Sequence, residues 1–345
     1  MGLLLGALAD AVLADPARWH PVAGFGACAA ALERRCYADR RSAGVAHTAV
    51  LVGGAVGLGV AAEVVSRRHP VAQTCVTAAA TWAVLGGTSL ARHGTALAAA
   101  LEGESTVSAQ RGVPDLAAAR AHISALCGRD PEVLDAAGMA RAGTESMAEN
   151  TSDAAVAPLL WGAVAGVPGL LGYRAINTLD AMVGYRSPRY ARFGWAAARV
   201  DDLVNLVPAR VTALLIALLA PVVGGSPGTA IAAWRRDAST HPSPNAGPVE
   251  AAAAGALGVA LGGPTVYPHG TENRPRLGSG RPPLPVDLRR AARLSQLVGV
   301  AATVLACLSA CGSAVLGRVV LARQLPAEGR AIGATRAGLA RGPGR

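Results

Sequence analysis

The stretch VAHTAVLVGGAVGLGVAAEVV, residues 45–65, decides the fold class of this chain. Its only polar side chains are one His, one Thr and one Glu close to its end. A helix of about twenty apolar residues spans the hydrocarbon core of a lipid bilayer. Gly53 and Gly57 lie four residues apart, a small-xxx-small spacing that is typical of a helix-packing face in membranes. The stretch therefore predicts a transmembrane helix.

Other apolar runs extend this pattern along the chain. Two of them are strong and predict further spans, residues 71–91 and 294–317. Three are weaker because they contain proline, glycine or polar residues: 154–173 with a Pro168-Gly169 break, 203–225, and the short run 248–263. Irregular backbone at membrane depth is tolerated only where it faces protein or water. Each weak run can therefore cross the membrane, re-enter it or pack inside the bundle.

The composition agrees with a membrane bundle. Apolar residues make up 52% of the chain and charged residues 16%, whereas about a quarter of a soluble domain is charged. The net charge is +10 and the chain contains no Lys, which excludes a lysine Schiff base and a P-loop lysine. The Arg residues lie between apolar runs, and only 3% of the residues are aromatic. This pattern indicates Arg residues that flank membrane spans, and it argues against a nucleic-acid partner.

Cysteine and histidine spacing predicts no metal or disulfide framework. The six Cys form no CxxC pair and the seven His form no HxxxH pair. We therefore expect neither a disulfide scaffold nor a zinc site. Residues 1–9 are apolar but lack a basic region, so no cleaved signal peptide is expected.

The connection at about residues 92–145 has the punctuation of soluble helices. Pro114-Asp115 opens one predicted helix, which Gly128 ends. Asp130-Pro131 opens a second, which Gly143 ends. This connection is therefore expected to be a helical loop region.

Together these features predict an all-α fold, a polytopic transmembrane helical bundle with amphipathic or re-entrant helices. Residues 1–323 are expected to form a single membrane domain, and residues 324–345, rich in Gly, Arg and Ala, a disordered tail. The predicted location is the cell membrane, as a multi-pass protein in contact with the lipid bilayer. The Arg content of alternate loops does not fix the orientation.

Acidic and amide residues recur in or beside the weak apolar runs. Ser146-x-x-Glu149 matches a capping box and predicts a helix that begins near Ser146. Residues three apart share a helix face. Three pairs with this spacing join one carboxylate to one carboxamide: Asn150 with Asp153, Asn177 with Asp180, and Asp202 with Asn205, and Glu149 and Asp201 lie beside them.

Helix capping or interhelical hydrogen bonds would explain any single pair. Three pairs at the edges of membrane-grade helices favour a functional site, because ionisable groups there are costly and usually functional. Carboxylate and amide oxygens are also hard ligands that suit magnesium.

Two further segments supply candidate anion contacts. Arg174 and Arg186 lie among tyrosines, and the planar fork of Arg matches phosphate and carboxylate groups. A loop that faces lipid phosphates is an equal alternative. Ser243–Gly247 leads into a helix predicted to open at Pro248, where free backbone amides favour an anion. A plain loop before an ordinary helix explains this segment equally well.

These motifs, taken in order, resemble the CobD/CbiB family of cobalamin-biosynthesis membrane proteins from about Asp10 to Gly317. The similar segments are DAVLADPARWHPV (10–22), AENTSD (148–153) followed by APL (157–159), YRAINTLDAMVGYR (173–186), DDLVNLVPAR (201–210), SPNAG (243–247), GALG (255–258) and LGG (261–263). The family's central signature more often reads Thr-Val-Asp-Gly where this chain has Thr151-Ser-Asp-Ala, and Pro248-Val stands where a bulkier pair is common. The acidic and amide positions are intact.

The resemblance implies adenosylcobinamide-phosphate synthase activity, a ligase reaction that consumes ATP with Mg²⁺. A propionate carboxylate of adenosylcobyric acid would be joined to aminopropanol or its phosphate. The implied partners are this corrinoid, the amine, the lipid bilayer and other enzymes of the corrinoid pathway, with no nucleic acid. Carboxylate activation by phosphoryl transfer requires mainly positioning and charge neutralisation, for which Mg²⁺ and Arg suffice.

On this resemblance we assign hypothetical roles to the site residues. The catalytic set is Glu149, Asn150, Asp153, Asn177, Asp180, Asp201, Asp202 and Asn205. Within it, Asp153, Asp180 and Asp202 would hold magnesium or accept the amine proton. The substrate-binding or phosphate-binding set is Arg174, Arg186, Arg210, Ser243, Asn245, Gly247 and Glu250.

Two other functions compete with this hypothesis. A phospholipid-type alcohol phosphotransferase also places Asp and Arg beside membrane helices, but here Asp180 is followed by Ala and the later spacing does not fit. A transporter or a corrinoid-binding scaffold without catalysis would suit intramembrane acid–amide pairs, although no inverted repeat is visible.

Overall fold

The computed structural model describes residues 1–16, 19–103, 115–185, 187–267 and 270–324. The predicted anion contact Arg186 and the tail after Gln324 lie outside these residues. The described helices and strands are α1 (Gly2–Leu13), α2 (Pro21–Cys36), α3 (Arg41–Ser66), α4 (Pro70–Val84), α5 (Gly87–Leu101), α6 (Leu116–Leu126), α7 (Ala136–Thr151), α8 (Ala157–Val183), α9 (Trp195–Val204), α10 (Leu206–Leu219), α11 (Pro227–Asp237), α12 (Ala246–Leu257), β1 (Leu261–Tyr267), β2 (Gly270–Leu277) and α13 (Pro285–Gln324).

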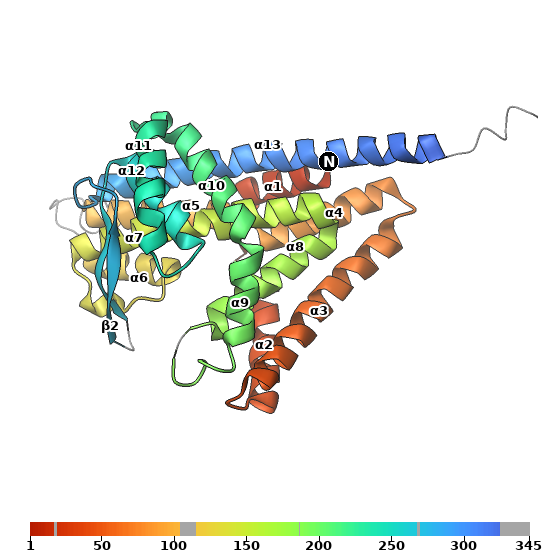
Figure 1. Cartoon of the computed structure of the whole chain (residues 1–345), viewed down its shortest axis with the longest axis horizontal. Coiled ribbons are helices and arrows are strands. Elements are labelled where there is room, and N and C mark those ends of the chain that lie inside the picture. The colour runs from red at the N-terminus through yellow and green to blue at the C-terminus, as the bar shows by residue number, and fades with distance from the viewer. Residues whose placement is uncertain (17–18, 104–114, 186, 268–269, 325–345) are drawn as a thin grey trace, which may run out of the picture.

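The predicted helical membrane bundle is confirmed. Among the described residues, five helical segments are long and apolar enough to cross a bilayer: Arg41–Ser66, Pro70–Leu101, Ala136–Val183, Leu206–Val223 and Pro285–Gly312. The long helices α3, α4, α8 and α13 extend along the molecule, while α6, α7, α11, α12 and the strands gather at one end (Figure 1). The antiparallel hairpin β1–β2 was not predicted.

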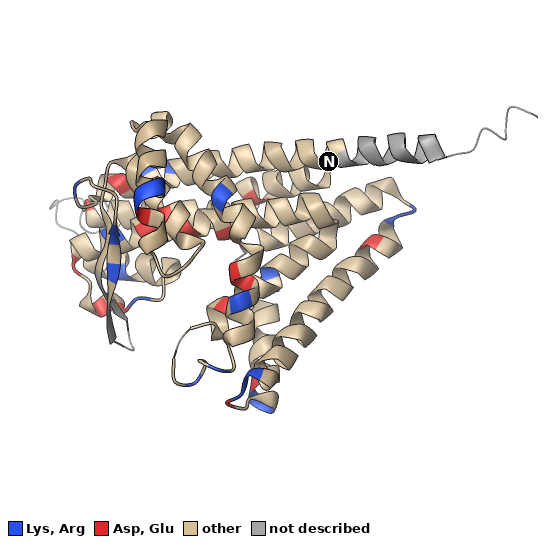
Figure 2. Ribbon diagram, viewed as in Figure 1, with Lys and Arg blue, Asp and Glu red and all other residues tan. Residues whose placement is uncertain are grey.

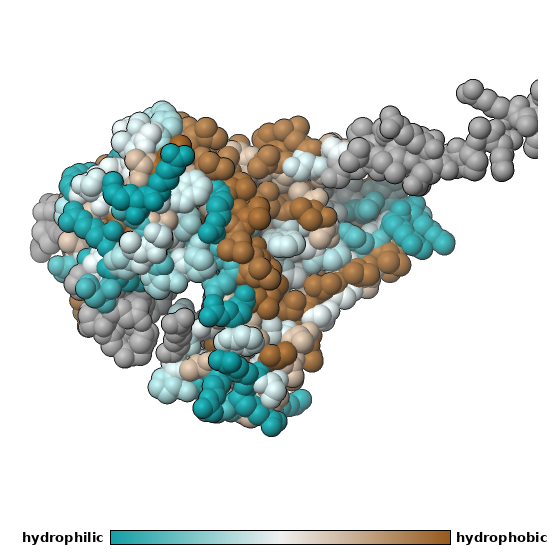
Figure 3. Space-filling view, in the orientation of Figure 1, coloured by the Kyte–Doolittle hydropathy of each residue, from teal (hydrophilic) through white to brown (hydrophobic). Residues whose placement is uncertain are grey.

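Charge and hydropathy follow this division. Acidic and basic residues concentrate at the end that holds the strands and at the tips of the long helices (Figure 2). A hydrophobic band crosses the middle of the visible face between hydrophilic ends (Figure 3). Many side chains of α3 are exposed, including those of Val60, Val64 and Val65. An outward apolar face between polar ends is the surface that a bilayer covers.

The predicted span 71–91 is interrupted at Leu85 and Gly86. Helix α4 ends at Val84 and α5 begins at Gly87. The amide of Gly86 donates to the carbonyl of Ala154, with the N and O atoms 3.0 Å apart. Because neighbouring protein satisfies the freed amide, the break is tolerated inside an apolar segment.

The weak run 154–173 folds back on itself. Within α8, Ala165 and Gly166 have non-helical backbone angles, with φ +60° at Gly166. The side chains of Asp153 and Asn177 then lie 3.1 Å apart, although a straight helix would separate residues this distant in sequence by about 36 Å. Ala165-Gly166 is therefore the turn of a helical hairpin with two antiparallel arms, three residues before the predicted Pro168-Gly169 break.

The other two weak runs differ: one is long enough to cross the membrane, and the other packs inside the bundle. Residues 206–223, helix α10 with its final turn, are long enough to span. Residues 248–263 do not form one span, because α12 ends at Leu257 and β1 begins at Leu261. Almost every side chain of α12 is buried, and the helix packs against α10 and α11 inside the bundle.

Three predicted helix boundaries were wrong, those at Asp130-Pro131, Gly143 and Ser146. Helix α7 begins at Ala136 behind a cap from Asp135 and continues through Gly143 and Ser146. Gly143 does not end the helix; its missing side chain admits Leu97 and Leu288, each 2.7 Å from where a Cβ would lie. Ser146 is no cap, and its hydroxyl donates to the carbonyl of Leu126 at 2.5 Å. Long-range packing overrides both local stop and start signals here.

The predicted packing face of α3 is also displaced. No heavy atom lies within 4 Å of a Cβ built at Gly53 or Gly57. Gly59 is the residue in close contact, because a Cβ there would lie 2.6 Å from Cα of Pro168. The α8 hairpin therefore packs on α3 two residues further along than the small-xxx-small pair indicated.

We expect Glu63→Ala to loosen the turn of this hairpin. Oε1 of Glu63 accepts a hydrogen bond from the amide of Val167 at 2.8 Å, directly after the turn. An amide left without an acceptor costs about 1–3 kcal/mol. The thermal midpoint in detergent should fall for Glu63→Ala and much less for Glu63→Gln, which keeps an acceptor. Val64→Ala, at an exposed neighbour, is the control, and an equal fall there would contradict the role of Glu63.

Candidate functional site

Two adjoining cavities lie where the predicted acid–amide segments meet. Their volumes are about 370 Å³ and about 200 Å³, and Glu149, Asp153 and Asp180 line both. The larger cavity is also lined by Arg129, Glu145, Ser146, Asn150, Asn177, Tyr185 and Arg274. The smaller is also lined by Ser152, Asp201, Asp202, Asn205, Ser243 and Asn245. The three sequence segments therefore converge on one place.

Hydrogen bonds link carboxylates to amides within and between helices. The amide nitrogen of Asn177 on α8 donates to Oδ2 of Asp153 at 3.1 Å. The amide nitrogen of Asn205 donates to Oδ2 of Asp201 at 3.0 Å, and its Oδ1 accepts from the hydroxyl of Tyr173 at 2.9 Å. These bonds hold α7, α8 and α9 in a fixed relation around the cavities.

The predicted pairing within each segment differs from this network. Asn177 bonds Asp153 rather than Asp180, and Asn205 bonds Asp201 rather than Asp202. Asn150 turns back to Ser146, donating to its carbonyl at 3.0 Å. Asn177 thus has its partner on another helical segment, whereas Asn205 and Asn150 bond residues four positions earlier on their own helices.

A π-helical turn, Ser152–Val156, places Asp153 at the junction of α7 and α8. Such turns widen the helix by one residue and are frequent at functional sites. The carbonyl of Ala154 in this turn accepts the amide of Gly86 from the α4–α5 break. Two irregular backbone segments thus support each other beside the acidic residues.

The smaller cavity is strongly acidic. All its charged lining residues in the described chain are carboxylates: Glu149, Asp153, Asp180, Asp201 and Asp202. Burial, and then the charge of Asp153, raise the pKa of Asp201 to about 7. Asp202 pairs with the guanidinium of Arg199 at 3.4 Å. A site of this charge favours a cation such as an ammonium group or a divalent metal ion.

The tentative magnesium trio of Asp153, Asp180 and Asp202 is not a preformed metal centre. No group of three or more His, Cys, Asp or Glu in the described residues is arranged to hold a metal ion. Magnesium usually takes one or two protein carboxylates and completes its shell with water and substrate phosphates. The smaller cavity offers such a donor set, because Asp180 and Asp202 both line it.

The predicted phosphate cradle Ser243–Gly247 is only partly directed at the cavity. Ser243 and Asn245 line the smaller cavity. Oγ of Ser243, however, already accepts the amides of Asn245 and Ala246, so these amides are not free for an anion. Gly247 packs against Ala238, whose carbonyl oxygen would lie 2.5 Å from a Cβ.

Two other predicted contacts lie behind the cavities. Arg210 donates to Oδ1 of Asn245 at 3.0 Å, and Asn245 donates to the carbonyl of Asp202 at 2.7 Å. Arg210 therefore acts on the cavity wall through Asn245. Glu250 is fully buried on α12, and its Oε1 lies 3.9 Å from Nη1 of Arg274.

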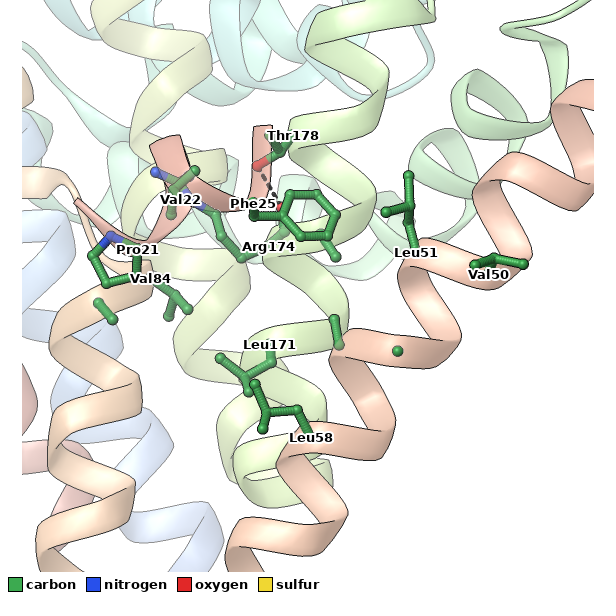
Figure 4. Close-up of a pocket in the computed structure, with 14 residues that line it drawn as sticks. Pro21, Val22, Phe25, Val50, Leu51, Leu58, Val84, Leu171, Arg174 and Thr178 are labelled. Atoms are coloured by element: carbon green, nitrogen blue, oxygen red, sulfur yellow. Dashed lines mark hydrogen bonds between the residues drawn. The ribbon is translucent and has the colours of Figure 1, made fainter. Parts of the chain in front are cut away.

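Arg174 faces a different cavity. This third space, about 350 Å³, lies between α2, α3 and α8 and is lined almost wholly by apolar side chains (Figure 4). The Nε atom of Arg174 is buried and has no hydrogen-bond partner in the described residues. Its guanidinium interacts electrostatically with the carboxylates of Asp15 and Asp153. Arg174 therefore lies between the apolar cavity and the carboxylates of Asp15 and Asp153. It lines neither of the two acidic cavities.

The opening motif around Asp10 and Asp15 braces the α4–α5 break. Oδ2 of Asp10 accepts the amide and the hydroxyl of Thr88 at 3.2 and 2.9 Å. The amide of Asp15 donates to Ser89, and its carboxylate lies 3.3 Å from His20. These contacts fix the first turn of α5 against α1.

Sequence reasoning missed the cations of the larger cavity, Arg129 and Arg274. Arg129 lies in the loop after α6 and pairs with buried Glu145. Arg274 lies on β2, within the hairpin that was not predicted. Neither residue belongs to a periodic apolar segment, and the one usable signal was the polar run Glu272–Arg276 after the Leu261-Gly-Gly motif.

We expect Glu250→Gln to preserve or raise stability. Burial, and then the charges of Glu145 and Glu149, hold the pKa of Glu250 well above its usual range. A carboxyl whose pKa rises on folding loses stability as pH rises above the unfolded value, about 4.3. Gln removes that loss, so the unfolding midpoint in detergent should be at least that of the parent near pH 8 and less dependent on pH.

Glu132→Gln, at an exposed glutamate, provides the matched control for this substitution. A midpoint for Glu250→Gln clearly below the parent near pH 8 would show that Glu250 is needed in its charged form.

Membrane-spanning helices that enclose a buried acidic cavity define a polytopic membrane protein with a candidate catalytic site. A family model described as CobD/Cbib protein matches residues 3–295. The chain therefore belongs to the CobD/CbiB family and is a cobalamin-biosynthesis protein of the membrane.

Curated relatives agree with this assignment. The chain is 57% identical to the cobalamin biosynthesis protein CobD of Mycobacterium tuberculosis over 307 residues, covering 89% of this chain and 94% of the relative. It is 42% identical to CobD of Chromobacterium violaceum over 302 residues, covering 85% and 90%. No solved structure matches the chain.

Proposed function

We propose that this protein is a ligase of the adenosylcobinamide-phosphate synthase type. It would join a propionate carboxylate of adenosylcobyric acid to aminopropanol or aminopropanol phosphate, with consumption of ATP. The observation that carries the proposal is the convergence of six carboxylates and two guanidinium groups, from segments far apart in sequence, on two adjoining cavities.

The chemistry requires an activated carboxyl group. The carboxylate oxygen attacks the γ-phosphorus of ATP, which gives an acyl phosphate and ADP. The amine nitrogen then attacks the acyl carbon, the C–O bond to phosphate breaks, and one proton leaves the nitrogen. The products are an amide, ADP and inorganic phosphate. Such a sequence needs charge neutralisation, positioning and a proton acceptor rather than a protein nucleophile.

The smaller cavity supplies the features that the amine needs. Its carboxylates attract the ammonium form of the donor and can accept the proton lost when the amide forms. Asp153, Asp180 and Asp202 are the proposed acceptors or magnesium ligands. Asn177 and Asn205 hold the neighbouring carboxylates in place through hydrogen bonds. When bound, Mg²⁺ would neutralise phosphate charge, and Asp180 and Asp202 are the residues placed to hold it.

The alternative is a corrinoid-binding membrane scaffold or transporter without catalysis. Both the ligase and the scaffold or transporter would use a polar cavity beside membrane helices. The membrane location and other corrinoid-pathway enzymes as partners are compatible with each. Only an enzyme, however, makes ATP hydrolysis depend on both the corrinoid and the amine.

The deciding experiment identifies the product. Detergent-purified protein is incubated with adenosylcobyric acid, ATP, Mg²⁺ and either aminopropanol or its phosphate, and the corrinoids are analysed by mass spectrometry. We expect a product whose mass equals the sum of corrinoid and amine less one water, with one ADP formed for each amide. Absence of any such product with folded protein would leave the scaffold or transporter as the function.

A further inference from the structure

Two arginines line the larger cavity, and neither belongs to a motif that the sequence analysis identified. Arg129 and Arg274 line it together with Glu149, Asn150 and Tyr185. No Arg in the described residues lines the smaller cavity. The two cavities share carboxylates but differ in their other charged residues. Those of the smaller cavity are all carboxylates, whereas the larger cavity also contains two guanidinium groups.

Arg129 is held in place from behind. Its guanidinium pairs with Oε2 of Glu145, and both side chains are buried. The other oxygen of Glu145 accepts the amide of Gly262, at the start of the hairpin, at 2.6 Å. One buried carboxylate therefore connects the cation to the hairpin backbone, which fixes both.

Arg274 is carried to the cavity by strand β2. The base of the hairpin is anchored by buried Leu261 and Leu277, which pair across the strands. The amide of Gly278 donates to Oδ2 of Asp237 on α11 at 2.7 Å. Glu250 lies 3.9 Å from Nη1 of Arg274 on the side away from solvent.

We propose that Arg129 and Arg274 receive the phosphate group of a substrate in the larger cavity, and that Glu145 and Glu250 are their positioning residues. This inference rests on the proposed function. The guanidinium forks of Arg129 and Arg274, which line the same cavity, match the oxygens of a phosphate. The phosphate can belong to ATP or to the amine donor, and in either case the ammonium end of the donor is drawn to the acidic cavity.

The test compares Arg274→Gln and Arg274→Lys with Arg276→Gln. Arg276 is on the same strand but is exposed and lines another cavity, so its replacement is the matched control. We expect KM for one phosphate-bearing substrate to rise about tenfold in Arg274→Gln, consistent with the loss of one charge-assisted contact. Arg274→Lys should recover part of this, and Arg276→Gln should match the parent.

The separate arms identify the source of the phosphate. A raised KM for ATP alone assigns the nucleotide, and a raised KM for aminopropanol phosphate, with that for aminopropanol unchanged, assigns the donor. A lower kcat and thermal midpoint with every KM unchanged would indicate a purely structural arginine and overturn the proposal.

A binding measurement keeps this test independent of turnover. Inorganic pyrophosphate is titrated calorimetrically into the parent, Arg274→Gln and Arg276→Gln. Binding that is lost only in Arg274→Gln supports the site even if no amide product forms. Binding that is equal in all three proteins, or absent in the parent, overturns it.

Discussion

Replacing Asp180 by Asn is expected to lower kcat at least about 100-fold, within the range of losses for groups that move a proton or stabilise charge in the transition state. Asp180 lines both cavities, and its charged neighbours are Asp201, Asp202 and Glu149. Asn keeps the size and polarity of the side chain but cannot carry charge or accept the amine proton. The measurement is ATP- and amine-dependent formation of the amide product.

Two comparisons separate this effect from misfolding. Asp39→Asn changes an exposed aspartate that lies 3.7 Å from Arg192, far from the cavities, and should leave kcat unchanged. The thermal midpoint of Asp180→Asn should equal or exceed that of the parent, because a buried carboxylate among like charges is removed. Unchanged turnover in folded Asp180→Asn protein would remove Asp180 from the chemistry.

The membrane helices could be predicted because their signal is local. A run of about twenty apolar residues is sufficient to identify a span, whatever it packs against. The interruptions could be located but not interpreted. Leu85-Gly86 and Ala165-Gly166 are both short breaks in apolar runs, yet at the first the chain continues into the next helix and at the second it reverses. The difference depends on distant partners, Ala154 in one case and Glu63 in the other.

The residues of the candidate site could also be found, but their partners could not. Carboxylates and amides within membrane segments indicate a functional site because burying them is costly. The spacing within one helix suggested which residues share a face, whereas the hydrogen bonds of Asn177 with Asp153 and of Tyr173 with Asn205 depend on how the helices pack. Arg274 was beyond reach because its position depends on a hairpin whose strands lack an apolar–polar alternation.

Gly166→Ala is expected to be strongly destabilising, at about 2–4 kcal/mol. Gly166 has φ +60° and ψ −145°, a conformation that costs other residues about 1–3 kcal/mol. An added Cβ would also lie 2.1 Å from Oε1 of Glu63, displacing the carboxylate that accepts the amide of Val167. The loss of that bond adds about 1 kcal/mol.

The consequence of this change reaches the site because the turn aligns the two arms of α8. Opening it moves Asn177 away from Asp153, so amide formation should fall together with the thermal midpoint. Gly53→Ala on α3 is the control, since no heavy atom lies within 4 Å of its added Cβ. A midpoint and turnover for Gly166→Ala equal to those of Gly53→Ala would show that the turn does not hold the acid–amide network together.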